Sequence, residues 1–346
     1  MAGDEGAPEQ NRTAVLTVPR TVVQEDRAVP RPGAGEVLVR VRAVTVCGSD
    51  VHYYEHGRIG DFVVEAPLVL GHECSGTVVG HGPGAGRHPV GALVAVEPGV
   101  PCGRCGPCRA GTYNLCPDVR FLATPPVDGA FTEYLVVHED FLHAVPDGTD
   151  AVTAALVEPT AVAVWANRKA AVGPGDRVLV TGAGPIGLLC AAVAAARGAP
   201  EVVVSDVSVE RLERAAEFGA TATVHARELA GHDRRYTVLL ECSGVEAALR
   251  DGLAGLRPAG RAVLVGMAAS GNQNVPVGLV QSRELSLVGT FRYANAYPEA
   301  IDLIRSGRVT PGPLVGATFT LADAESALRV AHEDPTVLKA AVLLEP

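Results

Sequence analysis

The chain has 346 residues, a formal net charge of −10, 47% hydrophobic residues and 4% aromatic residues. This length predicts about two domains, and the acidic charge argues against a surface for nucleic acid or for an anionic membrane. The acidic segment Met1 to Gln10 lacks the apolar stretch of a secretory signal. We therefore expect a cytoplasmic protein whose eight cysteines stay reduced.

The region from residue 11 to about residue 160 is predicted to be rich in strands. Short β-branched segments alternate with turn clusters such as Pro30-Arg31-Pro32-Gly33. The clearest expected strands are residues 37–46, 74–80 and 92–97. This pattern is typical of a barrel-like domain.

A thiol, an imidazole and a carboxylate flank the first two of these strands. Cys47 comes after the first strand, and His72-Glu73 comes directly before the second. A lone Cys is usually a small buried hydrophobe, and a His-Glu pair is usually exposed. Together, however, three ligands of mixed softness suit Zn²⁺ with one coordination position left open, as in a catalytic site.

Four further cysteines occur within a short segment. Cys102, Cys105, Cys108 and Cys116 have the spacing C-x₂-C-x₂-C-x₇-C, with Gly and Pro residues between them. Four thiolates can close a tetrahedral zinc site and leave no open position. The segment therefore predicts a structural zinc.

From about residue 161 the sequence changes to alternating strands and helices. Helices are expected at residues 187–197, 208–218 and 246–256, the last ending at Pro258 and Gly260. The expected strands are residues 177–181, 202–205, 221–225, 238–242, 262–266 and 285–289. Such alternation predicts a parallel, doubly wound sheet. A last strand, residues 338–344, is expected to return to the first domain.

A glycine motif links the first of these strands to a helix. Gly182, Gly184 and Gly187 form G-x-G-x-x-G, with Pro185 and Ile186 between the last two. In this setting the glycines allow a tight turn, a close approach to a pyrophosphate and close packing of helix on strand. The same glycines and Pro185 argue against reading the uncharged stretch 178–196 as a membrane span.

Asp206 ends the next strand, where an acidic side chain accepts hydrogen bonds from the adenosine ribose. It would repel a 2′-phosphate, so NAD is expected rather than NADP. Arg211 either flanks the adenine or is an ordinary surface charge. The predicted cofactor set is completed by Val265, Gly266, Thr290 and Arg292.

These features resemble the zinc-dependent medium-chain dehydrogenase/reductase family, and within it the sorbitol (polyol) dehydrogenases. The resemblance runs from about residue 13 to the C-terminus. It is closest in residues 47–53, 71–73, 121–126, 157–159 and 289–293. Two departures are the four-cysteine segment, which some animal polyol dehydrogenases lack, and the segment after Glu158, where relatives often carry Gly and His.

The resemblance implies an α/β fold with a GroES-like, β-rich catalytic domain and a Rossmann domain, with the active site in the cleft between them. The catalytic domain would span residues 1–160 and 293–346, with a structural zinc lobe at about 98–118. The Rossmann domain would span residues 161–292. Two zinc ions per chain and a homo-oligomer, commonly a tetramer, are implied as well.

The family's functional residues map onto this sequence. Cys47, His72 and Glu73 would bind the catalytic zinc, and Glu158 would bind it directly or hold its water. The polyol pocket would be lined by Tyr53, Phe121, Thr124, Arg292 and Tyr293. Polar groups there favour a polyhydroxylated substrate, because a simple alcohol would leave them unpaired at a cost of roughly 1–3 kcal/mol each.

The expected reaction transfers a hydride from the alcohol carbon to the nicotinamide, with zinc as Lewis acid. A relay through Ser49, the cofactor ribose and His52 would carry the proton to solvent, and Glu158 is a rival base. Otherwise Ser49 is a turn residue and His52 a surface histidine. The alternatives for the whole chain are a dehydrogenase of another secondary alcohol (a cyclitol, threonine or butanediol) or a catalytically silent regulator that binds zinc and nucleotide.

Overall fold

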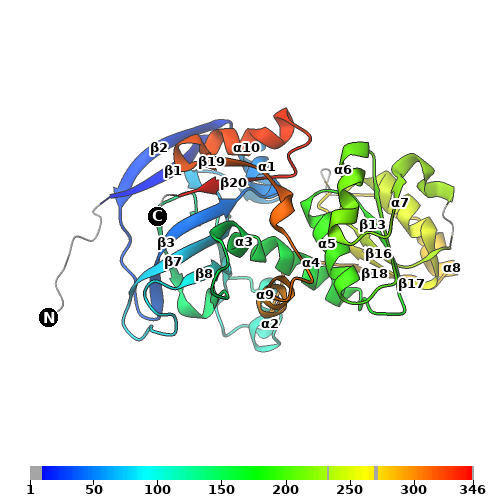
Figure 1. The fold of residues 1–346 in the computed structure, drawn as a ribbon, viewed down its shortest axis with the longest axis horizontal. Coiled ribbons are helices and arrows are strands. Elements are labelled where there is room, and N and C mark those ends of the chain that lie inside the picture. The colour runs from blue at the N-terminus through cyan, green and yellow to red at the C-terminus, as the bar shows by residue number, and fades with distance from the viewer. Residues whose placement is uncertain (1–9, 232–233, 269–271, 345–346) are drawn as a thin grey trace. The chain divides into compact units, whose positions relative to one another are not determined.

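The computed structural model describes residues 10–231, 234–268 and 272–344. Its contacts divide the chain into two compact units (Figure 1). The first unit runs up to Glu158 and resumes at Gly312, and the second runs from Pro159 to Pro311.

Residues 293–311, which the sequence analysis assigns to the catalytic domain, thus group with the second unit. Helix α9 (Tyr297–Arg305) explains this grouping. Its Glu299 accepts hydrogen bonds from Arg168 and Arg197, which both belong to the second unit. Two guanidinium groups on one carboxylate hold the helix there.

The first unit is built on a seven-stranded sheet in the order β12-β8-β7-β3-β20-β19, with β11 paired to β3. Strand β3 shows why it forms, since its valines are buried at every second position while the intervening residues are half-buried. The strands of this unit are β1 (Gln10–Val18), β2 (Thr21–Ala28), β3 (Glu36–Thr45), β4 (Arg58–Ile59), β5 (Phe62–Val63), β6 (Leu68–Val69), β7 (Glu73–His81), β8 (Leu93–Val96), β9 (Gly99–Val100), β10 (Arg120–Phe121), β11 (Tyr134–His138), β12 (Leu142–Ala144), β19 (Val315–Thr320) and β20 (Lys339–Leu343).

Helices cover parts of this sheet and connect its strands. They are α1 (Gly48–His56), α2 (Gly106–Arg109), α3 (Ala151–Ala155) and α10 (Ala324–Glu333), and α4 (Val157–Lys169) crosses from the first unit into the second. Short 3₁₀ segments are η1 (Tyr113–Leu115), η2 (Glu139–Phe141), η5 (Gly312–Leu314) and η6 (Leu321–Asp323). The expected return of the C-terminal strand is confirmed, because β20 pairs with β3 and lies beside it in Figure 1.

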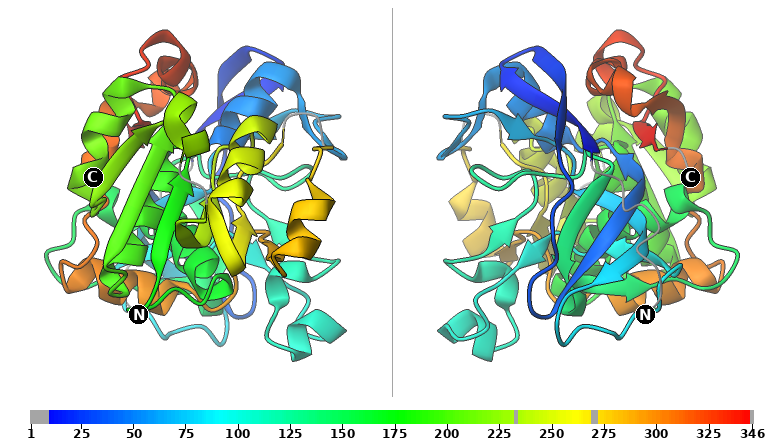
Figure 2. Two further views of the ribbon diagram at one scale, coloured as in Figure 1. Left: turned by 90° about the vertical axis from the view of Figure 1, so that its right-hand side faces the viewer. Right: turned by 90° about the vertical axis from the view of Figure 1, so that its left-hand side faces the viewer.

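The second unit has a six-stranded parallel sheet in the order β15-β14-β13-β16-β17-β18. The chain runs outward from β13 through β14 to β15 and then restarts beside β13 at β16. Right-handed crossovers therefore place helices on both faces, and the strands of this unit face the reader in the left view of Figure 2. The expected doubly wound sheet is confirmed, with its switch point between β13 and β16.

The strands of the second unit are β13 (Arg177–Thr181), β14 (Glu201–Asp206), β15 (Ala222–His225), β16 (Tyr236–Glu241), β17 (Leu256–Leu264) and β18 (Ser286–Gly289). Its helices are α5 (Pro185–Ala196), α6 (Val209–Arg214), α7 (Glu246–Gly255), α8 (Val277–Ser282) and α9, with 3₁₀ segments η3 (Ala215–Phe218) and η4 (Ala226–Gly231). Ser208 caps α6, because its side chain accepts a hydrogen bond from the amide of Arg211.

One expected boundary is wrong. Pro258 and Gly260 do not separate the helix from the next strand. Both lie inside β17, which begins at Leu256, directly after α7. The pairing of β17 with β16 shifts register between Tyr236 and Val238. A bulge of this kind accommodates Pro and Gly inside a strand.

In the described part of the chain, no helix combines the length and the apolar character that a membrane crossing requires. The uncharged stretch 178–196 is instead a buried strand, a turn and the buried helix α5.

Candidate active site and metal centres

Cys47, His72 and Glu73 converge because two neighbouring strands deliver them. Cys47 follows the end of β3, and Glu73 begins β7. The antiparallel register pairs Thr45 with Glu73, so the end of β3 lies beside the start of β7. One ligand atom from each of the three residues lies within 4.8 Å of the others.

The chemistry of these donors fits zinc. At zinc–ligand distances of 2.0–2.3 Å, the ligand atoms of a tetrahedral site lie roughly 3.3–3.8 Å apart. The observed spacing within 4.8 Å therefore needs little adjustment to close around an ion. A thiolate, an imidazole and a carboxylate fill three positions and leave the fourth for water or substrate.

Asp50 organises this site from the first turn of α1. Its carboxylate accepts hydrogen bonds from the amides of Cys47 at 3.0 Å and Gly71 at 2.9 Å. The same carboxylate lies 3.5 Å from Nδ1 of His72. Asp50 thus joins the two ligand-bearing segments and orients the imidazole, as carboxylates behind metal-binding histidines commonly do.

These contacts set the charges of the pair in the metal-free protein. Burial raises the pKa of Asp50, but the adjacent His72 and the amides of Cys47 and Gly71 outweigh it and lower the pKa overall. Burial lowers the pKa of His72, but Asp50 and Cys47 raise it well above its ordinary value. Metal binding must therefore displace a proton from the imidazole.

A buried lysine holds the third ligand. Lys339 Nζ lies 2.6 Å from Oε2 of Glu73, and both side chains are almost fully buried. The hydroxyl of Thr45 donates to the same oxygen. Burial lowers the pKa of Lys339, but the charges of Glu73 and Cys47 raise it overall, so the side chain stays cationic.

Of the predicted substrate-pocket residues in the first unit, Phe121 packs directly against a predicted metal ligand. The ring of Phe121 packs against that of His72 at 5.6 Å. Thr124 donates its amide to the carbonyl of Phe121, which fixes the loop after β10. Tyr53 is buried in α1, one helical turn beyond Ser49.

Ser49 and His52, the predicted proton relay, also lie on α1. Ser49 is half-buried and His52 is exposed, and residues three apart on a helix are neighbours. The ring of His52 lies 5.9 Å from that of His56. This helix therefore leads from the metal ligands to solvent.

Glu158 is buried at the end of the first unit. Its charge raises the pKa of both Cys74 and Lys339, which places it close to the metal ligands. It does not belong to the group of ligand atoms within 4.8 Å of one another. Cys74 stays a thiol, because burial above all raises its pKa to about 12.

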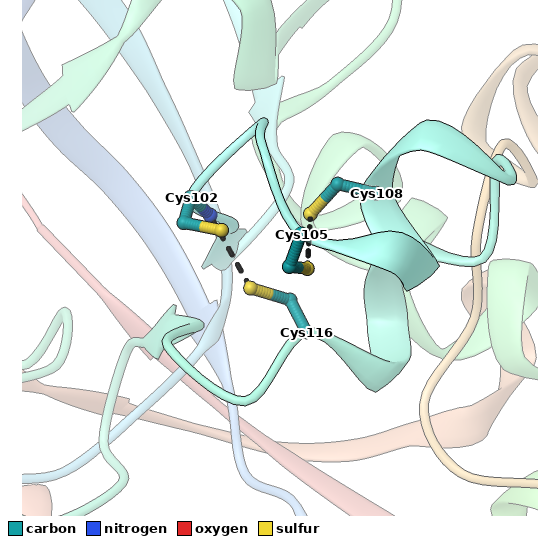
Figure 3. Close-up of side chains that lie close together, drawn as sticks. All are labelled: Cys102, Cys105, Cys108 and Cys116. Atoms are coloured by element: carbon teal, nitrogen blue, oxygen red, sulfur yellow. Dashed lines mark hydrogen bonds between the residues drawn. The ribbon is translucent and has the colours of Figure 1, made fainter.

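The four-cysteine segment forms a second cluster (Figure 3). The sulfur atoms of Cys105 and Cys108 lie 3.3 Å apart, and the amide of Cys102 donates to the sulfur of Cys116. The amides of Arg104 and Cys105 lower the pKa of Cys102 to about 7, which favours the thiolate. All eight cysteines of the chain are free.

A buried glutamate anchors this segment to the sheet. Glu97 accepts a hydrogen bond of 2.6 Å from the hydroxyl of Tyr113, which lies between the third and fourth cysteines. Its other oxygen lies 2.8 Å from Nε2 of His143 on β12. The cluster is thus tied to β12 and to the loop after β8.

The glycine motif of the second unit has the geometry that its sequence predicts. Gly182 has φ +94° at the turn after β13. A Cβ on Gly187 would lie 1.8 Å from the carbonyl oxygen of Gly182, so only glycine allows this approach of helix to strand. A Cβ on Gly184 would meet nothing within 4 Å, so the N-terminus of α5 is open at that point.

Asp206 lies at the end of β14, beside this turn. Its carboxylate accepts hydrogen bonds from the amides of Ala183 at 2.6 Å and Ser208 at 2.9 Å. The carboxylate is thereby fixed beside the glycine motif, where the ribose of a dinucleotide is expected. Arg211 is half-buried on α6.

The other predicted cofactor residues follow β17 and β18. Val265 and Gly266 donate their amides to the carbonyl of Glu241, and Thr290 donates to that of Leu264. The carboxyl ends of parallel strands meet at one edge of the sheet, so these residues share an edge with the glycine motif. Arg292 and Tyr293 belong to this second unit, and Arg292 adopts φ +53° with its guanidinium over the ring of Phe291.

Three residues of the metal site escaped the sequence analysis: Thr45, Asp50 and Lys339. Asp50 had a local signal, because it stands three residues after a candidate ligand at the start of a helix. Lys339 had another, because it is a single charge in an apolar strand. Thr45 had none, since its role depends on the register of β3 with β7.

Comparison with known proteins places both units. Residues 33–147 match the family model of the alcohol dehydrogenase GroES-like domain, and residues 185–306 match that of the zinc-binding dehydrogenases. The expected GroES-like and Rossmann fold is thereby confirmed.

Relatives match along almost the whole chain. The sorbitol dehydrogenase of Bacillus subtilis is 41% identical over 329 residues, which cover 93% of each chain. A probable D-xylulose reductase A of Emericella nidulans is 42% identical over 334 residues, covering 92% of this chain and 93% of that one. The crystal structure of L-idonate 5-dehydrogenase from Escherichia coli is 32% identical with a TM-score of 0.91, covering 97% of this chain and 98% of that one.

Proposed function

The chain belongs to the zinc-dependent medium-chain dehydrogenase/reductase family, and we propose that it oxidises a polyol to a ketose with NAD as the hydride acceptor. The observation that carries this proposal is the convergence of Cys47, His72 and Glu73, a donor set that suits Zn²⁺ with one coordination position left open. The relatives that match it over 92–93% of its length are named for sorbitol and xylulose.

The residues of the first unit divide the work at the metal. Zinc bound there acts as a Lewis acid toward the oxygen of the reacting hydroxyl. Cys47, His72 and Glu73 hold it, and Asp50 keeps the imidazole oriented through its contact with Nδ1. The second metal centre, formed by Cys102 and its three partners, has no open position and serves the fold.

The proton of the hydroxyl needs a path to water. We assign this path to Ser49 and His52, because they are neighbours on α1 and their exposure increases away from the ligands. Glu158 is the rival base, since it is buried close to the ligands. A variant Ser49→Ala that kept full turnover and its pH profile would favour Glu158.

A sugar alcohol fits the residues assigned to the pocket better than a simple alcohol does. Tyr53, Thr124, Arg292 and Tyr293, which the family resemblance assigns to the pocket, all carry polar groups. The adjacent hydroxyls of a polyol can exchange hydrogen bonds with such groups, which the chain of an aliphatic alcohol cannot do. A cyclitol, threonine and butanediol remain the rival substrates.

NAD is the cofactor that Asp206 favours. Its carboxylate is already positioned by two amides next to the glycine motif and would accept from the ribose hydroxyls. A 2′-phosphate would meet this negative charge. Asp206→Ala should therefore reduce the preference for NAD over NADP by about 10–100-fold, corresponding to the roughly 1–3 kcal/mol of a lost charged hydrogen bond.

The deciding experiment is a substrate panel followed by the absorbance of reduced cofactor. Sorbitol, xylitol and ribitol are compared with a cyclitol, L-threonine, 2,3-butanediol and ethanol, each with NAD and with NADP. We expect the highest kcat/KM with a polyol and NAD. Activity confined to threonine, butanediol or ethanol would contradict the proposal, and no activity with any alcohol by a protein that binds zinc and NAD would favour the silent regulator.

We further propose that the protein acts in the cytoplasm as a homo-tetramer, without nucleic acid or membrane partners. Free cysteines at all eight positions suit a reducing compartment. The tetramer is supported by family resemblance, and light scattering on the purified protein tests it. A monomer at working concentration would contradict this assembly.

A further inference from the structure

The C-terminal strand brings a cation to the back of the catalytic ligands. Strand β20 pairs with β3 so that Ala341 faces Thr45, and β3 pairs with β7 so that Thr45 faces Glu73. Paired residues of an antiparallel sheet share a face. Lys339 stands two residues before Ala341, so its side chain points to the same face as the carboxylate of Glu73.

Lys339 contacts both segments that carry ligands. Its ammonium group lies 2.6 Å from Oε2 of Glu73 and 2.9 Å from the carbonyl oxygen of Val46, next to Cys47. Thr45 donates its hydroxyl to the same Oε2. In the part of the chain that the structure describes, Oε1 of Glu73 accepts no hydrogen bond. Two donors thus occupy one carboxylate oxygen and leave the other available.

We propose that Lys339 is a positioning residue of the catalytic metal centre: together with Thr45 it binds Oε2 of Glu73, so that Glu73 offers the metal Oε1 alone. The proposal rests on the metal site of the proposed function but not on its substrate. A carboxylate that used both oxygens would occupy part of the open position. Lys339 therefore keeps that position free for the substrate hydroxyl.

The positive charge of Lys339 and its hydrogen bonds should have opposite effects on metal affinity. A measurement of metal affinity therefore separates the two roles. A cation near a metal ion repels it, so loss of the charge alone should tighten metal binding. Loss of an outer-shell hydrogen-bond partner instead weakens metal binding by about 10–100-fold. The contacts of Lys339 favour the second effect, because a buried Glu73 without them is free to rotate.

The test uses Lys339→Met and Thr45→Val in the full-length protein, with Lys169→Met as control. Lys169 is the only other lysine of the chain and lies over the ring of Trp165 in the second unit. Zinc affinity of the catalytic site is measured by competition with a chelator, in protein whose four-cysteine cluster retains its zinc. Cobalt in the catalytic site then reports the ligand geometry through its visible absorption.

We expect Lys339→Met to weaken zinc binding by about 10–100-fold and to change the cobalt spectrum. Thr45→Val should weaken zinc binding and change the cobalt spectrum to a smaller extent. Lys169→Met should leave both the zinc affinity and the spectrum unchanged. Zinc affinity in Lys339→Met equal to or tighter than that of the parent, or an unchanged cobalt spectrum, would overturn the proposal. If Lys339→Met fails to fold, Thr45→Val alone decides, and wild-type affinity and spectrum in that variant overturn the proposal.

These readouts do not require turnover. A protein that oxidised no polyol but showed the expected zinc and cobalt changes would contradict the proposed function and support the role of Lys339. If the protein oxidised a polyol but its variants lacked the expected zinc and cobalt changes, the proposed function would be supported and the role of Lys339 contradicted.

Discussion

The two metal centres of the first unit differ in how the chain assembles them. The four cysteines lie within residues 102–116, and backbone amides of the same segment contact the sulfurs of Cys102 and Cys116. The group of Cys47, His72 and Glu73 joins two strands, and its supporting residues extend to Lys339 in the last strand. The four-cysteine centre is local and closed, whereas the centre at Cys47, His72 and Glu73 is assembled over long range and open.

This difference teaches how a fold keeps a metal position vacant for chemistry. A closed site satisfies its ion with four equivalent thiolates and needs only a tight loop. An open site must hold three unlike ligands without a fourth. Asp50, Thr45 and Lys339 supply that rigidity, since each fixes a ligand or the backbone beside it.

The largest expected effect is the loss of the open centre. Cys47→Ser should lower kcat/KM by more than the roughly 100-fold that loss of an outer-shell partner costs, because it removes a ligand. The zinc content should fall from about two ions per chain to about one, which metal analysis measures. Cys74→Ala is the matched control, since Cys74 is buried beside the site and stays a thiol. Full turnover in Cys47→Ser would make the ligand assignment wrong.

Loss of the closed centre should affect stability instead of chemistry. Cys105→Ser should also reduce the metal content to about one zinc ion, but kcat/KM should stay within about tenfold of the parent. Because metal binding contributes to folding, the Tm should fall by several degrees, at about 2–4 °C per kcal/mol. Cys190→Ala in α5 controls for the loss of a buried thiol. A variant with unchanged Tm would show that the second zinc is not structural.

The two centres should also differ in their response to pH. Metal binding releases protons from ligands that are protonated in the metal-free protein. At the closed centre, Cys102, whose pKa is lowered to about 7, is largely protonated below that pH. The amide of Cys108 lowers the pKa of Cys105, but burial and the side chains of Cys108 and Cys102 raise it overall. At the open centre, burial lowers the pKa of the His72 imidazole, but Asp50 and Cys47 raise it well above its ordinary value.

Below about pH 7 the logarithm of zinc affinity should therefore fall by about two per pH unit at the closed centre, through Cys102 and Cys105, and by about one at the open centre, through His72. Chelator competition at several pH values, with Cys47→Ser and Cys105→Ser isolating each centre, measures both slopes. Equal slopes would contradict the assigned ligand sets.

The smallest expected effect concerns the attachment of the closed centre. Tyr113→Phe removes the hydroxyl that donates to buried Glu97, at a cost of about 1–3 kcal/mol. Tyr54→Phe is the control, because it removes a similar hydrogen bond to Glu325 in the same unit. Both variants should lose some stability, but only Tyr113→Phe should speed zinc exchange at the four cysteines. If zinc exchange at the four cysteines were no faster in Tyr113→Phe than in Tyr54→Phe, the hydrogen bond from Tyr113 to Glu97 would not stabilise the zinc centre.

The sequence predicts the four-cysteine centre from a local spacing rule, and it predicts the open centre from two short segments, Cys47 and His72-Glu73, that flank expected strands. The cysteine spacing, the glycine motif and Asp206 each have a pattern confined to a few residues. The parallel sheet was predictable for the same reason, since strands and helices alternate visibly. Pro258 and Gly260 misled the boundary of β17, because a bulge tolerates both residues inside a strand.

The supporting residues of the open centre were not predictable in the same way. Lys339 is 266 residues from Glu73 in sequence, and only the order β7-β3-β20 brings the two together. A lone lysine in an apolar strand indicates a buried partner but does not identify it. The contact of Thr45 with Glu73 depends on strand register, because a shift of one residue would turn the Thr45 side chain to the other face of the sheet.

The most direct test of the central claim is the rate of NADH formation from a polyol as a function of zinc at the open centre. A chelator removes that zinc while the four-cysteine cluster keeps its own, and zinc is then returned in steps. The account predicts no polyol-dependent rate without this zinc and a rate proportional to its occupancy as it returns. A polyol-dependent rate that persists without it, or that does not return with zinc, would contradict the account.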